Sequence, residues 1–212
     1  MTQKEIALCA VEALKNEYPD AICSLVADNP LQLLIATRLS AQCTDARVNL
    51  VTPELFAKYT TAEDFAAADV KDVEQIIHSC GFFRQKAKDI VGMAQMILAD
   101  FGGNVPDNIE DLTKLPGVGR KTANLIVGDV FNKPAVVADT HLIRIANRLG
   151  LVDTDDPYKV EMKLKKLLPD AESNDFCHRA VLHGRAVCDS RKPKCADCVM
   201  TAFCRKKKYK MK

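Results

Sequence analysis

The chain has 212 residues, 48% of them hydrophobic, with nine glycines and nine prolines. This length can bury a sizeable core in one large domain or two small ones, and the composition is that of a globular protein and not of a disordered one. No apolar run reaches transmembrane length and the first eighteen residues lack the pattern of a signal peptide, so we expect a cytoplasmic protein with no membrane partner.

The formal net charge is only +2, but it is distributed unevenly. From Arg185 to the end, ten basic residues are opposed only by Asp189 and Asp197, so this segment carries +8 and the rest of the chain −6. A basic end suggests a polyanionic partner, although a solvated tail without any partner is the other interpretation.

Helix signals follow one another along the whole chain. The amphipathic N-terminal segment is followed by Asn29-Pro30, a cap with proline at the first helical position, and by a helical run over 31–42. Capping-box spacing marks two short helices, at Thr61 with Asp64 and at Asp69 with Asp72. Apolar periodicity predicts further helices over 84–101, 108–115, 120–130, 140–150, 158–168 and 175–187. No segment alternates as a strand does, so we expect an all-α protein of about ten short helices.

The segment LPGVGRKTANLI, residues 115–126, joins two of these helices through a tight turn. Gly117 and Gly119 permit positive φ angles and a close backbone approach. The helix that follows begins with free amide groups, which favour an anion such as phosphate. The segment is not a nucleotide-binding P-loop, because an arginine separates Gly119 from Lys121 and no strand precedes it. A plain corner between helices and an anion site both remain open at this point.

The nine cysteines fall into two groups. Five are scattered among apolar neighbours and indicate small buried side chains: Cys9, Cys23, Cys43, Cys80 and Cys177. The other four have the spacing C-x6-C-x2-C-x5-C: Cys188, Cys195, Cys198 and Cys204. Four thiolates so close in sequence indicate a metal centre, and the spacing alone allows either zinc or an iron–sulfur cluster.

Three features of the sequence, the glycine turn, a segment that follows it and the cysteine cluster, together resemble the endonuclease III family of DNA glycosylases. LPGVGRKTA resembles the family's helix-hairpin-helix signature, and VVADTH, residues 136–141, resembles its catalytic aspartate segment. The cysteine spacing matches the family's [4Fe-4S] loop, and the resemblance extends from about Leu31 to Cys204.

The resemblance implies two α-helical lobes with a DNA-binding cleft between them. We expect a six-helix barrel lobe over residues 22–132, with the helix-hairpin-helix at about 108–131, and an iron–sulfur cluster lobe made of residues 1–21 and 133–212.

The resemblance also implies that Lys121 and Asp139 are catalytic and face each other across the cleft. An amine can attack C1′ of a damaged nucleotide, displace the base and leave a Schiff base, and β-elimination then cuts the strand on the 3′ side. Burial and nearby positive charge can lower the pKa of a lysine used in this way. Asp139 can assist proton transfer and stabilise developing charge, and it also lies where an N-cap is expected. Without the resemblance, Lys121 would be an ordinary surface charge.

Further residues are implied to contact DNA. Gln42 matches the glutamine that enters the gap left by the extruded base. Phe82 follows Gly81 at the family's wedge position, where leucine is usual, and ordinary core packing is the alternative for Phe82. His141 could touch a phosphate or be structural. The hairpin and the loop between the first two clustered cysteines supply the rest: Leu115, Gly117, Val118, Gly119, Arg120, Arg191, Lys192 and Lys194.

We therefore expect a bifunctional DNA glycosylase and AP lyase of base excision repair that excises oxidised pyrimidines, such as thymine glycol. Its partner would be double-stranded DNA with damaged bases or abasic sites, bound by a monomer at the bacterial nucleoid. Two alternatives stay open: a non-catalytic helix-hairpin-helix DNA-binding protein, and a mismatch-directed adenine glycosylase. The latter usually has serine in place of Lys121 and a glutamate in the early helix, whereas residues 31–44 contain no glutamate.

Overall fold

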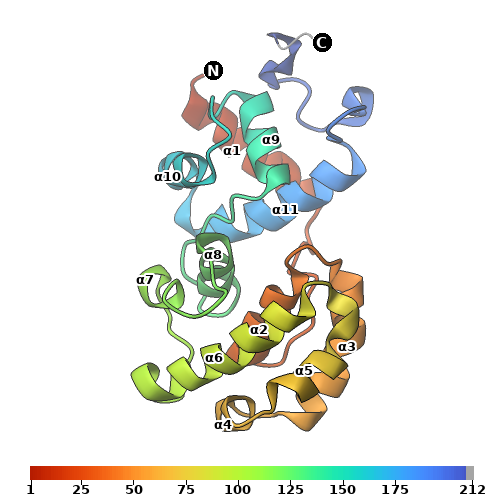
Figure 1. The fold of residues 1–212 in the computed structure, drawn as a ribbon. Coiled ribbons are helices and arrows are strands. Elements are labelled where there is room, and N and C mark those ends of the chain that lie inside the picture. Colours follow the sequence, from red (N-terminus) through yellow and green to blue (C-terminus); the bar gives the residue numbers. More distant parts are fainter. Residues whose placement is uncertain (209–212) are drawn as a thin grey trace. The chain divides into compact units, whose positions relative to one another are not determined.

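The part of the chain described by the computed structural model is entirely helical (Figure 1). The structure describes residues 1–208, so Lys210 and Lys212 of the predicted basic end lie outside the described residues. Within 1–208 there are eleven α-helices, four short 3₁₀ helices and no strand, which confirms the all-α class. None of these helices is long and apolar enough to cross a membrane.

The chain forms two compact units. The central unit is Cys23–Asn132, and the terminal unit combines Met1–Ile22 with the chain from Lys133 onward. The central unit contains α2 (Pro30–Ser40), α3 (Asp45–Lys58), α4 (Ala62–Ala66), α5 (Val70–Ile76), η1 (His78–Cys80), α6 (Phe83–Phe101), α7 (Ile109–Leu112) and α8 (Arg120–Asp129). The terminal unit contains α1 (Gln3–Glu17), α9 (Thr140–Leu149), α10 (Pro157–Leu167), η2 (Asp170–Glu172), α11 (Ser173–Ala186), η3 (Cys195–Asp197) and η4 (Arg205–Lys208).

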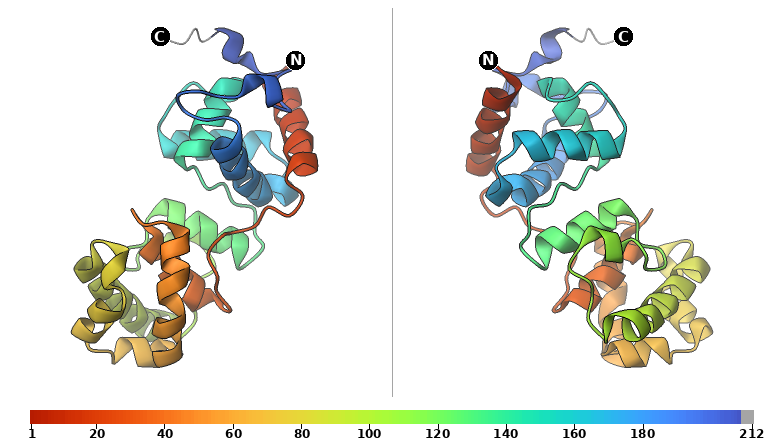
Figure 2. Two further views of the ribbon diagram at one scale, coloured as in Figure 1. Left: turned by 90° about the vertical axis from the view of Figure 1, so that its right-hand side faces the viewer. Right: turned by 90° about the vertical axis from the view of Figure 1, so that its left-hand side faces the viewer.

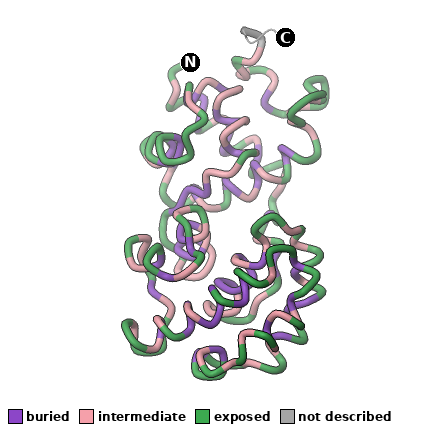
Figure 3. The backbone as a smooth tube through the Cα atoms, in the orientation of Figure 1, coloured by how far each residue is buried: buried purple, intermediate pink, exposed green. Residues whose placement is uncertain are grey.

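Helix α2 lies at the heart of the central unit. It begins as predicted, with the Asn29 side chain accepting a hydrogen bond from the amide of Gln32 and with Pro30 in the first turn. Five consecutive residues, Leu33 to Thr37, are buried, so the helix is covered on all its sides over this stretch (Figure 3). It packs against α3, α6 and α8, and the long α6 packs in turn against α4 and α5.

The terminal unit is organised around α11. This helix packs against α1 and α9, and α10 packs against α1 and α9 as well (Figure 2). The arrangement brings the N-terminal helix against segments more than a hundred residues later in the chain. A capping box between Thr2 and Glu5 fixes the start of α1.

Several helix boundaries differ from the predictions. Helix α3 was not predicted, and Pro53 lies inside it. The run predicted over 31–42 ends at Ser40, because the chain turns there into a left-handed conformation at Gln42. The helix predicted over 108–115 ends at Leu112, and it could not include the predicted last residue because Pro116 disfavours helical geometry at Leu115.

Two predictions about single residues were partly wrong. Thr61 and Asp64 form the predicted capping box, but Asp69 caps α5 alone, through the amide of Lys71. The carboxylate of Asp72 instead pairs with Tyr59 and Lys58.

All the scattered cysteines are free thiols, but only two are buried, while the other three, Cys9, Cys23 and Cys43, are half-buried.

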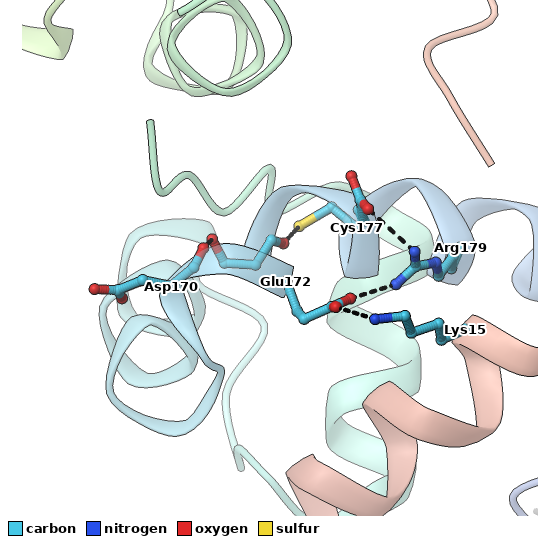
Figure 4. A network of polar contacts seen from close by, with 7 residues as sticks. Lys15, Asp170, Glu172, Cys177 and Arg179 are labelled. Atoms are coloured by element: carbon cyan, nitrogen blue, oxygen red, sulfur yellow. Dashed lines mark hydrogen bonds and ion pairs between the residues drawn. The ribbon is translucent and has the colours of Figure 1, made fainter. Parts of the chain in front are cut away.

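An ion-pair network joins α1 to α11 through η2 (Figure 4). The carboxylate of Glu172 accepts hydrogen bonds from the Lys15 ammonium and, at 2.7 Å, from Nη1 of the buried Arg179. Arg179 also donates to Asp175 at 3.0 Å. The hydrogen bond from Lys15, followed by that from Arg179, holds the pKa of Glu172 below its usual range. Without Glu172, the buried guanidinium of Arg179 would lose one of its two carboxylate partners, and a buried charge that loses a partner destabilises the fold.

We predict that Glu172→Gln lowers the free energy of unfolding by about 2 kcal/mol at neutral pH, because an amide cannot neutralise Arg179. A carboxylate whose pKa is lowered in the folded state contributes fully to stability at a pH above the ordinary glutamate pKa. This contribution is lost as the pH falls through the pKa that the group has in the folded protein. The difference from the wild type should therefore shrink in acid. Urea unfolding at pH 7 and below pH 4.5 measures both effects, with the exposed Glu12→Gln as control. An equal loss at both pH values would contradict the ion-pair explanation.

Candidate functional site

The predicted hairpin is present in the central unit as α7, a turn over residues 116–119, and α8. Gly117 has φ = +73°, and a Cβ atom at this position would lie 2.4 Å from Nε of Arg38 and 2.7 Å from Oδ2 of Asp89. Both the left-handed conformation and the close approach therefore require glycine. Gly119 is the N-cap of α8 and offers no side-chain cap. The first amides of α8 are thus not satisfied by a capping side chain, which is the arrangement that favours a bound anion.

An ion pair supports this turn from below. Nε of Arg38, on α2, donates to Oδ2 of Asp89, on α6, at 2.8 Å. Gln85 donates to the other carboxylate oxygen, also at 2.8 Å. The Arg38 and Asp89 side chains are 15% and 10% exposed, so the pair is shielded from water directly under Gly117. These residues were not predicted from the sequence, in which the one available signal was an arginine inside the apolar run LLIATRLS.

The predicted hairpin contacts differ in what they can offer DNA. Leu115 and Val118 are 2% and 6% exposed, so their side chains belong to the core and only their backbone can face a ligand. Arg120 is half-buried, and Gly117 and Gly119 are exposed. The hairpin is therefore suited to hold a phosphate through its backbone, without reading the base sequence.

Lys121 is the second residue of α8, next to these amides. It is exposed, so the burial expected of a nucleophilic lysine is absent in the central unit as it stands.

Asp139 belongs to the terminal unit and begins α9. Its Oδ1 accepts a hydrogen bond from the amide of Leu142 at 2.7 Å, which confirms the N-cap interpretation. Only one carboxylate oxygen is used in this bond. The cap therefore fixes the orientation of the carboxylate and leaves its second oxygen for other contacts.

His141 follows two residues later and is half-buried. Its Nδ1 lies 3.1 Å from Nη2 of Arg144, and a Cβ atom on Gly184 would lie 2.5 Å from the same nitrogen. Burial lowers the pKa of His141, Asp139 opposes this shift, and Arg144 adds to it. These contacts favour a structural role for a neutral imidazole.

Gln42 and Phe82 share an unusual property in the central unit. Residues 1–208 contain three non-glycine residues with positive φ, and two of them are Gln42 (φ = +54°) and Phe82 (φ = +47°). Both side chains are exposed, Phe82 to 70%, so core packing of Phe82 was a wrong alternative. Left-handed backbone at non-glycine residues is strained and is concentrated at functional sites. Each of the two residues projects from a short turn between helices.

The four clustered cysteines are free thiols, three of them half-buried and Cys195 exposed. No group of three or more His, Cys, Asp or Glu side chains within residues 1–208 is placed to hold a metal ion. Four thiols are nevertheless the donor type that a thiolate-bound metal centre uses. Burial is the chief cause of the raised pKa of Cys198, and the nearby Cys188 and Cys204 raise it further. A metal would remove these protons on binding.

Arg148, which the sequence analysis missed, anchors the cysteine segment. Its Nη1 donates to Sγ of Cys188 at 3.1 Å and to the carbonyl of Asp189 at 2.7 Å, and its Nη2 donates to the carbonyl of Ser190 at 2.9 Å. The loop that follows is held by Asp189, whose carboxylate accepts hydrogen bonds from the backbone amides of Arg191 and Lys192. The three basic side chains of this loop are exposed: Arg191, Lys192 and Lys194.

Comparison with known proteins gives consistent matches. A family model described as HhH-GPD superfamily base excision DNA repair protein matches residues 35–170. Endonuclease III of Synechocystis sp. is 47% identical over 204 residues, which cover 96% of this chain and 93% of that relative. Endonuclease III of Bacillus subtilis is 42% identical over 203 residues, 95% of this chain and 92% of that relative.

A solved structure of a trapped covalent intermediate between endonuclease III and DNA, an estranged-adenine complex, has the same fold. It matches with a TM-score of 0.91 and 42% sequence identity, and the match covers 100% of both chains. The family model covers more than half of the present sequence, and both relatives match nearly all of it. The chain therefore belongs to the endonuclease III family of helix-hairpin-helix base excision DNA repair proteins.

Proposed function

We propose that this chain excises oxidised pyrimidines from double-stranded DNA with Lys121 as the nucleophile. Membership of the endonuclease III family makes it a DNA glycosylase with AP lyase activity, and the non-catalytic and mismatch-directed alternatives are not favoured. The observation that supports the role of Lys121 is its position. It is an exposed amine at the second residue of α8, beside helix amides that lack a side-chain cap and can hold a phosphate.

The reaction requires an amine at that place. Nζ of Lys121, once deprotonated, attacks C1′ and the bond from C1′ to the base breaks, so the base leaves with the bonding electron pair and is protonated. The sugar ring then opens to a Schiff base, which acidifies the proton on C2′. Loss of that proton expels the 3′ phosphate and cuts the strand. The hairpin amides would hold the backbone during these steps.

Asp139 is proposed to supply the carboxylate for this chemistry. Its cap bond to Leu142 fixes one oxygen, and the other can accept a proton from the lysine or stabilise positive charge that develops on the sugar. A histidine two residues later, with a lowered pKa, is less suited to this role because its imidazole contacts Arg144.

Gln42 and Phe82 are proposed to fill the gap left by the extruded base. Extrusion is needed because the glycosidic bond is otherwise shielded in the stack, and it costs a few kcal/mol. A large apolar side chain that is 70% exposed suits insertion between bases, and an exposed amide can hydrogen-bond to the base left without a partner.

The cysteine segment of the terminal unit is proposed to bind a [4Fe-4S] cluster through Cys188, Cys195, Cys198 and Cys204. The four free thiols and their spacing support this proposal, and such a cluster would supply architecture for the exposed basic loop. We propose that this unit is the iron–sulfur lobe, and that Cys23–Asn132 is the barrel lobe with the hairpin. Arg191, Lys192 and Lys194 would then meet DNA phosphates. The protein would act as a monomer on damaged or abasic DNA at the nucleoid.

We predict that Lys121→Ala forms no covalent adduct when abasic-site DNA is treated with borohydride, and that it does not cut the strand. Duplex binding should be retained, because the hairpin amides that hold phosphate are unchanged. Gel analysis of trapped adducts, together with fluorescence anisotropy of labelled duplex, tests both statements. Lys114→Ala, which removes an exposed lysine of the same hairpin, should still be trapped. An adduct formed by the Lys121 variant would refute the assignment.

Asp139→Asn separates the two roles of Asp139, because asparagine caps a helix as well as aspartate does. We predict that base release from a thymine glycol duplex slows about 100-fold while the thermal midpoint is unchanged. Asp156→Asn is the matched control, since Asp156 caps α10 by the same kind of bond, to the amide of Lys159. Normal base release in the Asp139 variant would leave that residue with the cap alone.

Cys198→Ser tests the cluster. We expect the wild-type protein to contain about four iron and four sulfide per chain, and the variant to lose most of both. Chemical iron and acid-labile sulfide assays measure this, with Cys9→Ser, a half-buried cysteine on α1, as control. Stoichiometric zinc in place of iron would show that the thiols serve a different metal.

A further inference from the structure

Lys86, on α6 of the central unit, is a buried lysine that the reaction described above does not use. It is 1% exposed, and its ammonium donates to two backbone carbonyls, those of Leu39 at 2.7 Å and Cys80 at 2.6 Å. Burial lowers the pKa of Lys86 and is the chief influence on it. A buried ammonium is costly unless it is hydrogen-bonded, and these two bonds are what compensates it here.

The two carbonyls belong to segments far apart in sequence. Leu39 lies in the last turn of α2, and Cys80 is the last residue of η1. Carbonyls at helix ends lack intrahelical partners and carry partial negative charge, so a cation is their natural partner. The thiol of Cys80 does not compete as an anion, because burial chiefly raises its pKa to about 11.

Each of these helix ends leads directly into a strained turn. Gln42 follows Leu39 by three residues and Phe82 follows Cys80 by two, and both have positive φ and exposed side chains. One ammonium therefore ties the base of the Gln42 turn to the base of the Phe82 turn. Strained backbone of this kind persists only when its surroundings hold it firmly.

We propose that Lys86 is a positioning residue for gap filling: its ammonium fixes the spacing of the two turns so that Gln42 and Phe82 enter the duplex together. The inference rests on the proposed function, in which these two side chains occupy the gap. Lys86 acts through them and does not touch DNA itself. Its loss should therefore affect excision only while Gln42 and Phe82 are present.

The test is a mutant cycle on excision of thymine glycol from duplex DNA. Lys86→Met keeps the stem of the side chain and removes the ammonium, and we expect kcat/KM to fall about tenfold or more, as for a reacting group misplaced by a fraction of an ångström. In a Gln42→Ala/Phe82→Ala background the same change should have little further effect, because residues acting through one another are not additive. Lys88 is an exposed lysine two residues further along α6, and Lys88→Met should leave kcat/KM unchanged in either background.

A second readout reports gap filling directly. With 2-aminopurine opposite a tetrahydrofuran abasic analogue, wild-type protein should change the fluorescence on binding, and Lys86→Met should change it much less at saturation. If Lys86→Met does not fold, Lys86→Arg keeps the charge and the donors but is longer, and it should reduce the same two signals.

The outcomes separate the two proposals. A loss of excision that is equally large in the Gln42→Ala/Phe82→Ala background, or a wild-type 2-aminopurine signal in the Lys86 variant, would overturn the positioning role. If wild-type protein itself is not trapped on abasic DNA through Lys121, the proposed function fails first. Normal trapping by the wild type with an unaffected Lys86 variant would overturn only the present inference.

Discussion

The central unit depends on the ion pair between Arg38 and Asp89. It joins α2 to α6 and fills the space directly under Gly117, where even one added carbon would lie 2.4 Å from the guanidinium. Each charge is largely shielded from water, so neither can be removed without leaving the other uncompensated. The hairpin therefore takes its position from two residues that are not part of the hairpin signature, and the place of Lys121 on α8 follows from that position.

The same design recurs at the turns of Gln42 and Phe82. The backbone at both positions is left-handed, at a cost of about 1–3 kcal/mol each. Just before these turns, the carbonyls of Leu39 and Cys80 accept hydrogen bonds from the buried ammonium of Lys86. In the central unit, the uncapped start of α8 and the two strained turns thus lie over buried polar groups that are hydrogen-bonded.

How much of the structure the sequence predicts depends on how far apart in the chain the interacting residues are. Local rules predicted the cap at Asn29 and the box at Thr61, because these bonds span three residues. They failed for α3, where Pro53 hides the helix, and for Asp72, whose partners are Tyr59 and Lys58 and not the start of its own helix. They could not reveal Arg38–Asp89 or Lys86–Leu39, which join residues 51 and 47 positions apart and have no sequence signature.

In the terminal unit, one helix carries both features assigned to function. Asp139 caps the first turn of α9, and Arg148, in its last turn, holds Cys188 and the loop that follows, while the carbonyl of Arg148 accepts a hydrogen bond from Cys204. A ten-residue helix is stiff, so the carboxylate and the cysteine segment are linked at fixed distance. Whatever orders residues 188–204 therefore also steadies α9 and the carboxylate at its start. The proposed metal centre would thereby have a physical route to influence the orientation of the Asp139 carboxylate without taking a chemical part in the proposed reaction.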